Sequence, residues 1–166
     1  MPGTRRKTIL TQTFAALGVS SAFLSALKDI GYQQPTPIQS KSVAHLLDGH
    51  DLMGVAQTGT GKTAAFGLPL LQRLDQANEP ARTRRPRSLI LAPTRELASQ
   101  IHTELEKFAK NTSIRCSVIF GGVGQNPQVR QLQKGVDVLV ATPGRLLDLV
   151  GQGHVDLSTI SVLVLD

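Results

Sequence analysis

The stretch Ala56-Gln57-Thr58-Gly59-Thr60-Gly61-Lys62-Thr63 decides the fold of this 166-residue chain. It follows the apolar run 51–55, which we predict to be a short buried strand, and it precedes residues 64–74, whose apolar side chains recur at helical spacing. A glycine-rich turn ending in Gly-Lys-Thr between a strand and a helix is typical of a phosphate-binding loop. Its glycines let successive backbone N–H groups point toward an anion, and the N-terminus of the helix adds the positive end of its dipole.

Two side chains of this phosphate-binding loop have the chemistry that a nucleoside triphosphate requires. We expect Lys62 to reach the β- and γ-phosphates and the Thr63 hydroxyl to ligate Mg²⁺. The general pattern opens with glycine, whereas this loop opens with Ala56. The alternative is a Gly/Thr-rich turn that binds nothing, and the place of Gly-Lys-Thr at a strand-to-helix junction argues against it.

Size and composition indicate an ordinary globular chain with room for one domain, or for part of a larger one. Hydrophobic residues make up 40% and charged residues 18%. A net charge of +6 favours a polyanionic partner, nucleic acid first. Because Cys116 is the only cysteine, an internal disulfide and a multi-cysteine zinc site are excluded.

The N-terminal residues 1–13 are expected to form a basic mobile arm, with the cluster Arg5-Arg6-Lys7 either solvated or in contact with phosphates. No long apolar segment follows this cluster, so we expect no signal peptide. No apolar stretch approaches the length of a membrane span. We therefore expect a cytoplasmic protein with no membrane partner.

From Phe14 the pattern is helical, with Ser20-Ser21 as a candidate N-cap; we expect a first helix that ends at Gly31 and a second that ends at Gly49. Pro35 and Pro37, between them, predict an extended and rigid segment.

After the phosphate-binding loop, short Val/Ile/Leu-rich runs alternate with helical patterns. This alternation predicts an α/β fold with a parallel sheet covered by helices on both faces. The strands are expected at residues 88–92, 114–120, 136–140 and 161–166. The polar segment 75–87 reads as a solvated loop, with RNA contact as the alternative use of its four arginines, Arg82, Arg84, Arg85 and Arg87.

Ligands of open parallel sheets bind at the carboxyl ends of the strands. Apart from the phosphate-binding loop, the residues that follow the predicted strands are Pro93–Ala98, Gly121-Gly122, Thr142–Leu146 and Asp166. Hydroxyls, arginines and helix N-termini suit a phosphodiester backbone. Asp166 follows four apolar residues, where enzymes with a phosphate-binding loop keep the carboxylate that holds Mg²⁺.

Taken in order, these motifs resemble the first RecA-like domain of a DEAD-box RNA helicase. The matching elements are Gly31-Tyr32 with 35–39 (the Q motif), 56–63 (motif I, where the family itself favours Ala first), 93–98 (Ia), 121–122, 142–146 (Ib) and 164–166, the opening of motif II. Phe14 lies 17 residues before Gly31, where the family keeps an isolated aromatic. The stretch 120–145 is most similar to the bacterial RhlE-like group. The resemblance divides the chain into a Q-motif region, 14–41, and a first RecA-like domain, 42–166, truncated at motif II.

The resemblance implies a role for each matching residue. Gln39 would read the adenine edge, Tyr32 would stack on the purine and Phe14 would buttress Tyr32; the alternatives are core packing for the two aromatics and a surface position for Gln39. Asp166 would contact Mg²⁺ through water, together with Thr63. The implied ATP-binding residues are Phe14, Tyr32, Gln39, Ala56, Gln57, Thr58, Gly59, Thr60, Gly61, Lys62 and Thr63. The implied RNA-backbone contacts are Pro93, Thr94, Arg95, Gly121, Gly122, Thr142, Pro143, Gly144 and Arg145, while Glu96 and Arg145 have loop bracing as their alternative.

The resemblance also indicates what these 166 residues lack. The family's motif II reads Asp-Glu-Ala-Asp and the sequence stops at its first Asp, before the water-activating Glu and before the second RecA-like domain with its arginine finger. Such fingers are worth about 10³–10⁵ in rate in related enzymes. We expect the intact parent to be an ATP-dependent RNA helicase and this chain alone to show no RNA-stimulated turnover. The alternative is a stand-alone, non-catalytic nucleotide- or RNA-binding module; an ATPase acting on DNA is disfavoured by the Q motif and by motif Ia.

Overall fold

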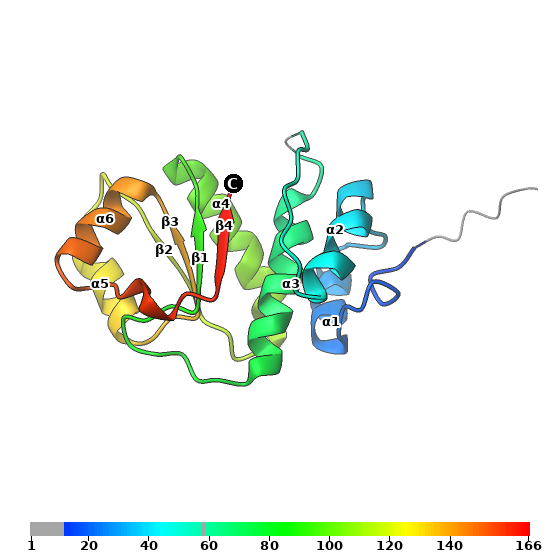
Figure 1. The fold of residues 1–166 in the computed structure, drawn as a ribbon, viewed down its shortest axis with the longest axis horizontal. Helices are drawn as coiled ribbons and strands as arrows, with labels where there is room; N and C mark the ends of the chain where they lie inside the picture. The colour runs from blue at the N-terminus through cyan, green and yellow to red at the C-terminus, as the bar shows by residue number, and fades with distance from the viewer. Residues whose placement is uncertain (1–11, 58) are drawn as a thin grey trace, which may run out of the picture.

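A four-stranded parallel sheet forms the centre of the protein (Figure 1). The computed structural model describes residues 12–57 and 59–166. The strands are β1 (Ser88–Leu91), β2 (Cys116–Ile119), β3 (Val138–Ala141) and β4 (Val162–Leu165), in the spatial order β2-β3-β1-β4. The predicted parallel α/β fold is therefore confirmed. Most of the predicted arm, residues 1–11, and Thr58 of the phosphate-binding loop lie outside the described residues.

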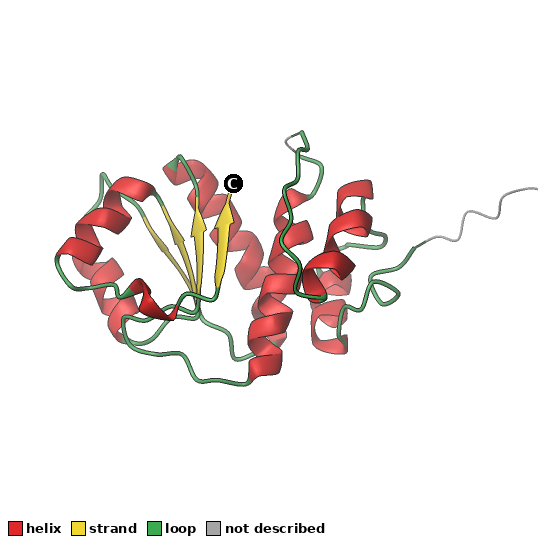
Figure 2. Cartoon of the chain, viewed as in Figure 1, coloured by secondary structure: helices red, strands yellow, loops and turns green. Residues whose placement is uncertain are grey.

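Helices cover both faces of the sheet, as the nearly continuous apolar strands require (Figure 2). Successive residues point to opposite faces, so Ile90 packs with one helical layer and Leu89 with the other. The first layer holds α3 (Lys62–Ala77) and α4 (Arg95–Phe108), and the second holds α5 (Asn126–Gln133) and α6 (Pro143–Gly151).

Two N-terminal helices, α1 (Ser21–Asp29) and α2 (Pro37–Leu47), lie on the far side of α3 from the sheet (Figure 1). Their apolar side chains join the same core as α3 and α4. Short 3₁₀ turns at Ala109–Asn111 and Leu157–Thr159 complete the fold. None of the helices in the described part of the chain is long and apolar enough to cross a membrane.

The predicted extended segment at the two prolines is wrong for its second half. Pro37 is the first residue of α2, and Thr36 is its N-cap with extended backbone angles. Proline is well suited to this position because its fixed φ matches the helix and its missing N–H would have had no helical partner.

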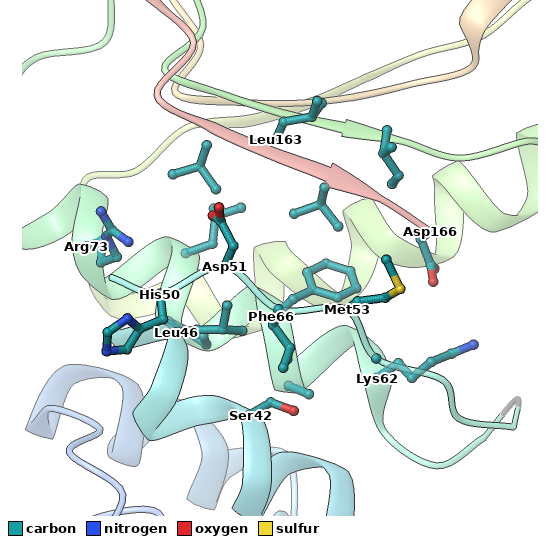
Figure 3. Close-up of a pocket in the computed structure, with 18 of the residues that line it drawn as sticks. Ser42, Leu46, His50, Asp51, Met53, Lys62, Phe66, Arg73, Leu163 and Asp166 are labelled. Carbon is teal, nitrogen blue, oxygen red and sulfur yellow. The ribbon is translucent and has the colours of Figure 1, made fainter. Parts of the chain in front are cut away.

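The predicted strand at 51–55 is also wrong. This segment pairs with no strand of the described sheet, and its side chains are exposed, Met53 to 95% and Val55 to 96%. A cavity of about 630 Å³ separates it from β4, so no backbone partner lies within reach (Figure 3). An apolar run becomes a strand only where a neighbouring backbone accepts its hydrogen bonds, and here that condition fails.

The last arginine of the segment 75–87, Arg87, is buried and joins two parts of the fold, so it is not in a solvated loop. Arg87 donates from Nε and Nη2 to Oδ1 of Asp137 at 3.0 and 2.8 Å, and from Nη1 to the carbonyl of Leu74 at 3.2 Å. The other Asp137 oxygen accepts the backbone N–H of Arg115 at 2.9 Å. Both members of the Arg87–Asp137 pair are buried, so the solvated reading is wrong for Arg87.

The earlier arginines of this segment lie at the surface. Arg82 pairs with Glu79 at 3.2 Å and Arg85 with Asp156 at 2.8 Å. The segment precedes β1 and therefore runs along the amino ends of the strands, opposite the edge that carries the phosphate-binding loop (Figure 1). That placement argues against the alternative that it contacts RNA bound at the carboxyl ends.

Candidate nucleotide site

The phosphate-binding loop has the backbone geometry that its glycines were expected to provide. Gly59 and Gly61 have φ values of +79° and +86°, a backbone region that residues other than glycine rarely adopt. The hydroxyl of Thr60 donates to the carbonyl of Gln57 at 2.7 Å and closes the turn. Gly61 is the N-cap of α3, so Lys62 and Thr63 lie in the first turn of that helix, at the positive end of its dipole.

Gln39 holds this loop from the side. It is fully buried; its Oε1 accepts the backbone N–H of Thr36 at 2.9 Å, and its Nε2 donates to the carbonyl of Gly61 at 3.1 Å. The Thr36 hydroxyl donates to the carbonyl of Thr60 at 2.9 Å. The first turn of α2 is thus tied twice to the phosphate-binding loop. A surface position for Gln39 is wrong, and in this structure its carboxamide contacts the protein rather than facing a cavity.

A cavity of about 830 Å³ lies between the phosphate-binding loop and α4. The structure brings to it the loop residues Lys62 and Thr63 and, from the end of β4, Asp166. The N–H of Asp166 donates to the carbonyl of Leu91 at 3.1 Å, which continues the pairing of β4 with β1 and fixes the backbone there. Figure 3 shows Lys62 and Asp166 together at one end of the neighbouring cavity as well.

The oxygen donors at this cavity fit Mg²⁺. Thr63 supplies a hydroxyl and Asp166 a carboxylate, and Mg²⁺ is usually held by one or two protein oxygens together with waters and substrate phosphates. Among the described residues there is no group of three or more His, Cys, Asp or Glu that could hold a metal ion.

Tyr32 lines the same cavity and is held from three directions. Its hydroxyl donates to Oε1 of Glu104 at 2.8 Å, its ring meets Phe108 edge to face at 5.9 Å between centroids, and Phe14 lies tilted at 6.3 Å. Burial and the adjacent Glu104 carboxylate raise the pKa of Tyr32 above its ordinary value, so the hydroxyl keeps its proton. Phe14 is itself buried in the core, so it both packs in the core and contacts Tyr32.

Sequence reasoning missed Glu104 and Phe108 as neighbours of this site. Phe108 fits the apolar stripe of α4, together with Ile101 and Leu105, and so reads as ordinary core. Glu104 lies beside that stripe, and a glutamate in a helix carries no signal of its own. Only the folded contact with Tyr32, 72 residues away in the chain, reveals its place.

At the carboxyl edge, Arg95 and Gly122 contact each other. The Arg95 guanidinium lies 5.4 Å from the ring centroid of Phe120, in a cation–π arrangement. Gly122 has a φ of +77°, and a Cβ there would lie 2.6 Å from Nη1 of Arg95. Thr94 caps α4, its hydroxyl accepting the N–H of Leu97 at 3.2 Å. Motif Ia and the loop of Gly121 and Gly122 are therefore adjacent.

Arg145 braces the same edge. Its Nη2 donates to the carbonyl of Val123 at 2.9 Å, and its Nε lies 3.8 Å from Oδ2 of Asp148. The Nη1 atom is buried and has no partner among the described residues. Arg145 therefore has the contacts that a role in bracing the loops requires. Glu96 forms no ion pair within residues 12–57 and 59–166, so no such contact is seen for it. Thr142 is buried, whereas Pro143 and Gly144 are exposed at the start of α6.

A sequence model of the DEAD/DEAH box helicase family matches residues 36–166. The chain belongs to this family. The matched region contains the phosphate-binding loop and Asp166, which line the cavity, and Gln39, which holds the loop, and the fold is that of a RecA-like helicase domain.

Curated and solved relatives agree with this membership. The chain is 48% identical over 155 residues to the ATP-dependent RNA helicase DeaD of Escherichia coli (strain K12), covering 93% of this chain and 24% of DeaD. It is 43% identical over 154 residues to the DEAD-box ATP-dependent RNA helicase CshA of Bacillus cereus, covering 93% and 28%. The crystal structure of the RNA helicase Prp28 from Chaetomium thermophilum bound to ADP superposes with a TM-score of 0.86 at 39% identity, covering 93% and 38%. The chain thus spans about a quarter of the length of these curated relatives.

Proposed function

We propose that this chain is the N-terminal ATP-binding part of an ATP-dependent RNA helicase that couples ATP hydrolysis to local unwinding or remodelling of RNA duplexes. One observation carries the proposal: Lys62, Thr63 and Asp166 line a single cavity at the carboxyl ends of the strands. The names of the DeaD and CshA relatives support it. In this proposal the second RecA-like domain belongs to the longer protein.

The nucleotide is ATP with Mg²⁺. The backbone N–H groups of the phosphate-binding loop and Lys62 would bind the phosphates, and Thr63 and Asp166 would hold the metal. Bound Mg²⁺ would neutralise the charge that develops on the phosphates. Tyr32 stacks on the purine. We also propose that Gln39 reads the adenine edge, for which its carboxamide would have to turn away from its contacts with Thr36 and Gly61.

RNA binds along the neighbouring edge through its sugar-phosphate backbone, and from such contacts we expect little sequence preference. Its proposed contacts are Pro93, Thr94, Arg95, Gly121, Gly122, Thr142, Pro143, Gly144 and Arg145. The net charge of +6 supports a polyanionic partner.

Calorimetric titration with ADP and Mg²⁺ tests the nucleotide part of this proposal. We expect the 166-residue chain to bind ADP more tightly than GDP and Lys62→Ala to lose most of that affinity. Lys28→Ala, at an exposed position of α1, is the matched control and should bind as the wild type does. Equal affinities for ADP and GDP in the folded chain would refute the adenine preference.

Turnover by these 166 residues alone remains a prediction: we expect no RNA-stimulated phosphate release. Release above that of Lys62→Ala, measured with RNA present, would refute it. Assignment to the RhlE-like branch likewise stays a prediction, since the relatives above bear the names DeaD and CshA. The cytoplasmic location is a proposal that cell fractionation can test.

A further inference from the structure

Glu104 is a charged side chain that faces the nucleotide cavity and that no motif accounts for. It lies in the C-terminal half of α4, and Tyr32 and Glu104 line the cavity together with Lys62 and Thr63. Its one hydrogen bond within the described residues accepts the Tyr32 hydroxyl at 2.8 Å. A carboxylate that accepts a hydrogen bond from a hydroxyl forms one of the stronger hydrogen bonds in proteins.

We propose that Glu104 is a positioning residue for purine binding: it holds the Tyr32 ring in the orientation that stacks on the base of the bound nucleotide. The inference rests on the proposed function, because it assumes that a purine nucleotide enters this cavity. Glu104 acts through Tyr32 and needs no contact with the nucleotide itself.

The contacts of Tyr32 explain why such a residue is needed. A tyrosine side chain turns about two bonds: rotation about Cα–Cβ swings the ring, and rotation about Cβ–Cγ turns its plane. Phe108 meets the ring edge to face and Phe14 is tilted at 53°, and these contacts restrict the plane of the ring. The hydroxyl oxygen lies on the Cβ–Cγ axis, so anchoring it to Glu104 fixes the direction in which the ring points and thereby its position at the cavity. A ring that is already fixed loses less conformational entropy when the base binds.

The segment of α4 that carries Glu104 is packed in the core. Its neighbours on α4, Ile101, Leu105 and Phe108, are completely buried between the sheet and α3. Thr94 caps the start of the helix. The part of α4 that carries Glu104 is therefore packed firmly against α3, whose first turn holds Lys62 and Thr63.

A comparison of two ligands separates this role from a general contribution to folding. ADP uses both the base site and the phosphate site, whereas inorganic tripolyphosphate uses the phosphate site alone. The net worth of one hydrogen bond corresponds to about a three- to tenfold change in an equilibrium constant. We expect Glu104→Ala and Tyr32→Phe each to weaken ADP binding by about three- to tenfold and to leave tripolyphosphate binding unchanged.

Further variants complete the test by calorimetry on the 166-residue chain. Because both substitutions break the same contact, the double variant should bind ADP no more weakly than the weaker single variant. Glu104→Gln keeps an oxygen acceptor and should retain most of the affinity. Glu106→Ala, at an exposed position two residues along the same helix, is the matched control and should behave as the wild type does.

Three outcomes would overturn the inference. ADP affinity unchanged in Glu104→Ala would show that Glu104 has no role in binding. Equal losses for ADP and tripolyphosphate would show that it only stabilises the domain. Additive losses in the double variant would show that Glu104 and Tyr32 act separately. A wild-type chain that binds tripolyphosphate but not ADP would instead overturn the proposed function, and with it the purine on which this inference rests.

Discussion

Replacing Gln39 by alanine tests whether the Q-motif region holds the phosphate-binding loop in place. The substitution removes two hydrogen bonds, to the N–H of Thr36 and the carbonyl of Gly61, from a completely buried side chain. Each lost hydrogen bond costs about 0.5–1.5 kcal/mol, and the space that the side chain leaves adds to this. We therefore expect the free energy of unfolding to fall by about 2–4 kcal/mol in urea denaturation.

The same experiment with ADP reports on the loop. At about 100 times its Kd, a ligand that binds only the native state raises the free energy of unfolding by about 2.7 kcal/mol. The wild type should show this increase and Gln39→Ala a smaller one, because its loop no longer has a fixed partner at Gly61. Gln34→Ala, at an exposed glutamine of the same segment, is the control. The reasoning is refuted if Gln39→Ala lowers the stability by less than about 0.5 kcal/mol more than Gln34→Ala does.

Three further predictions concern other parts of the fold. Gly122→Ala places a Cβ 2.6 Å from the Arg95 guanidinium at a φ of +77° and should displace Arg95, one of the proposed RNA contacts. Single-stranded RNA should then bind about two- to fivefold more weakly in fluorescence anisotropy. Gly124→Ala, in open space, is the control, and equal affinities for the two variants would contradict the prediction. Asp137→Ala leaves a buried guanidinium unpaired and should lower the free energy of unfolding by about 3–5 kcal/mol in urea; a loss below about 1 kcal/mol would be inconsistent with a buried pair. Burial raises the pKa of Cys116 from 9.0 to about 12. Iodoacetamide at pH 8 should therefore modify this half-buried thiol much more slowly in the folded chain than in the denatured chain, and equal labelling rates would contradict this. The free energy of unfolding should fall as the pH rises from about 9 to about 12, because the unfolded chain ionises first.

The sequence predicted the sheet well because its strands are buried on both faces. Runs such as 88–91 and 138–141 are apolar at every position or nearly so, and such runs identify interior parallel strands without any partner in view. The phosphate-binding loop was predictable for a different reason. The turn itself requires glycines, because its backbone has positive φ, and phosphate binding requires the Lys-Thr pair at the start of the helix. Both requirements can be recognised in the local sequence.

The errors fall where the structure depends on distant partners. Residues 51–55 have the composition of a strand, but a strand also needs a neighbour to pair with, and composition does not say where that neighbour lies. Arg87 sits among three other arginines and looks like them, yet it alone faces Asp137, 50 residues away. The burial of Gln39 did have a local signal, because Thr36 and Gln39 have the spacing of a capping box.

The contacts of Gln39 and Tyr32 explain why the N-terminal region cannot be a mere appendage of the sheet domain. Phe14 and the α1 and α2 side chains Phe23, Leu27 and Val43 share one hydrophobic core with α3 and α4, so α1 and α2 have no separate interior of their own. The N-terminal region, residues 14–47, also makes the hydrogen bonds that hold the site. Gln39 and Thr36 bond to the phosphate-binding loop, and Tyr32 bonds to Glu104 of α4. Any nucleotide that moves the loop must therefore strain or relieve contacts with α2. Under the proposed function, α2 holds the phosphate-binding loop and α4 holds the ring that we expect to stack on the purine, so we expect phosphate binding and base binding to be separable by mutation.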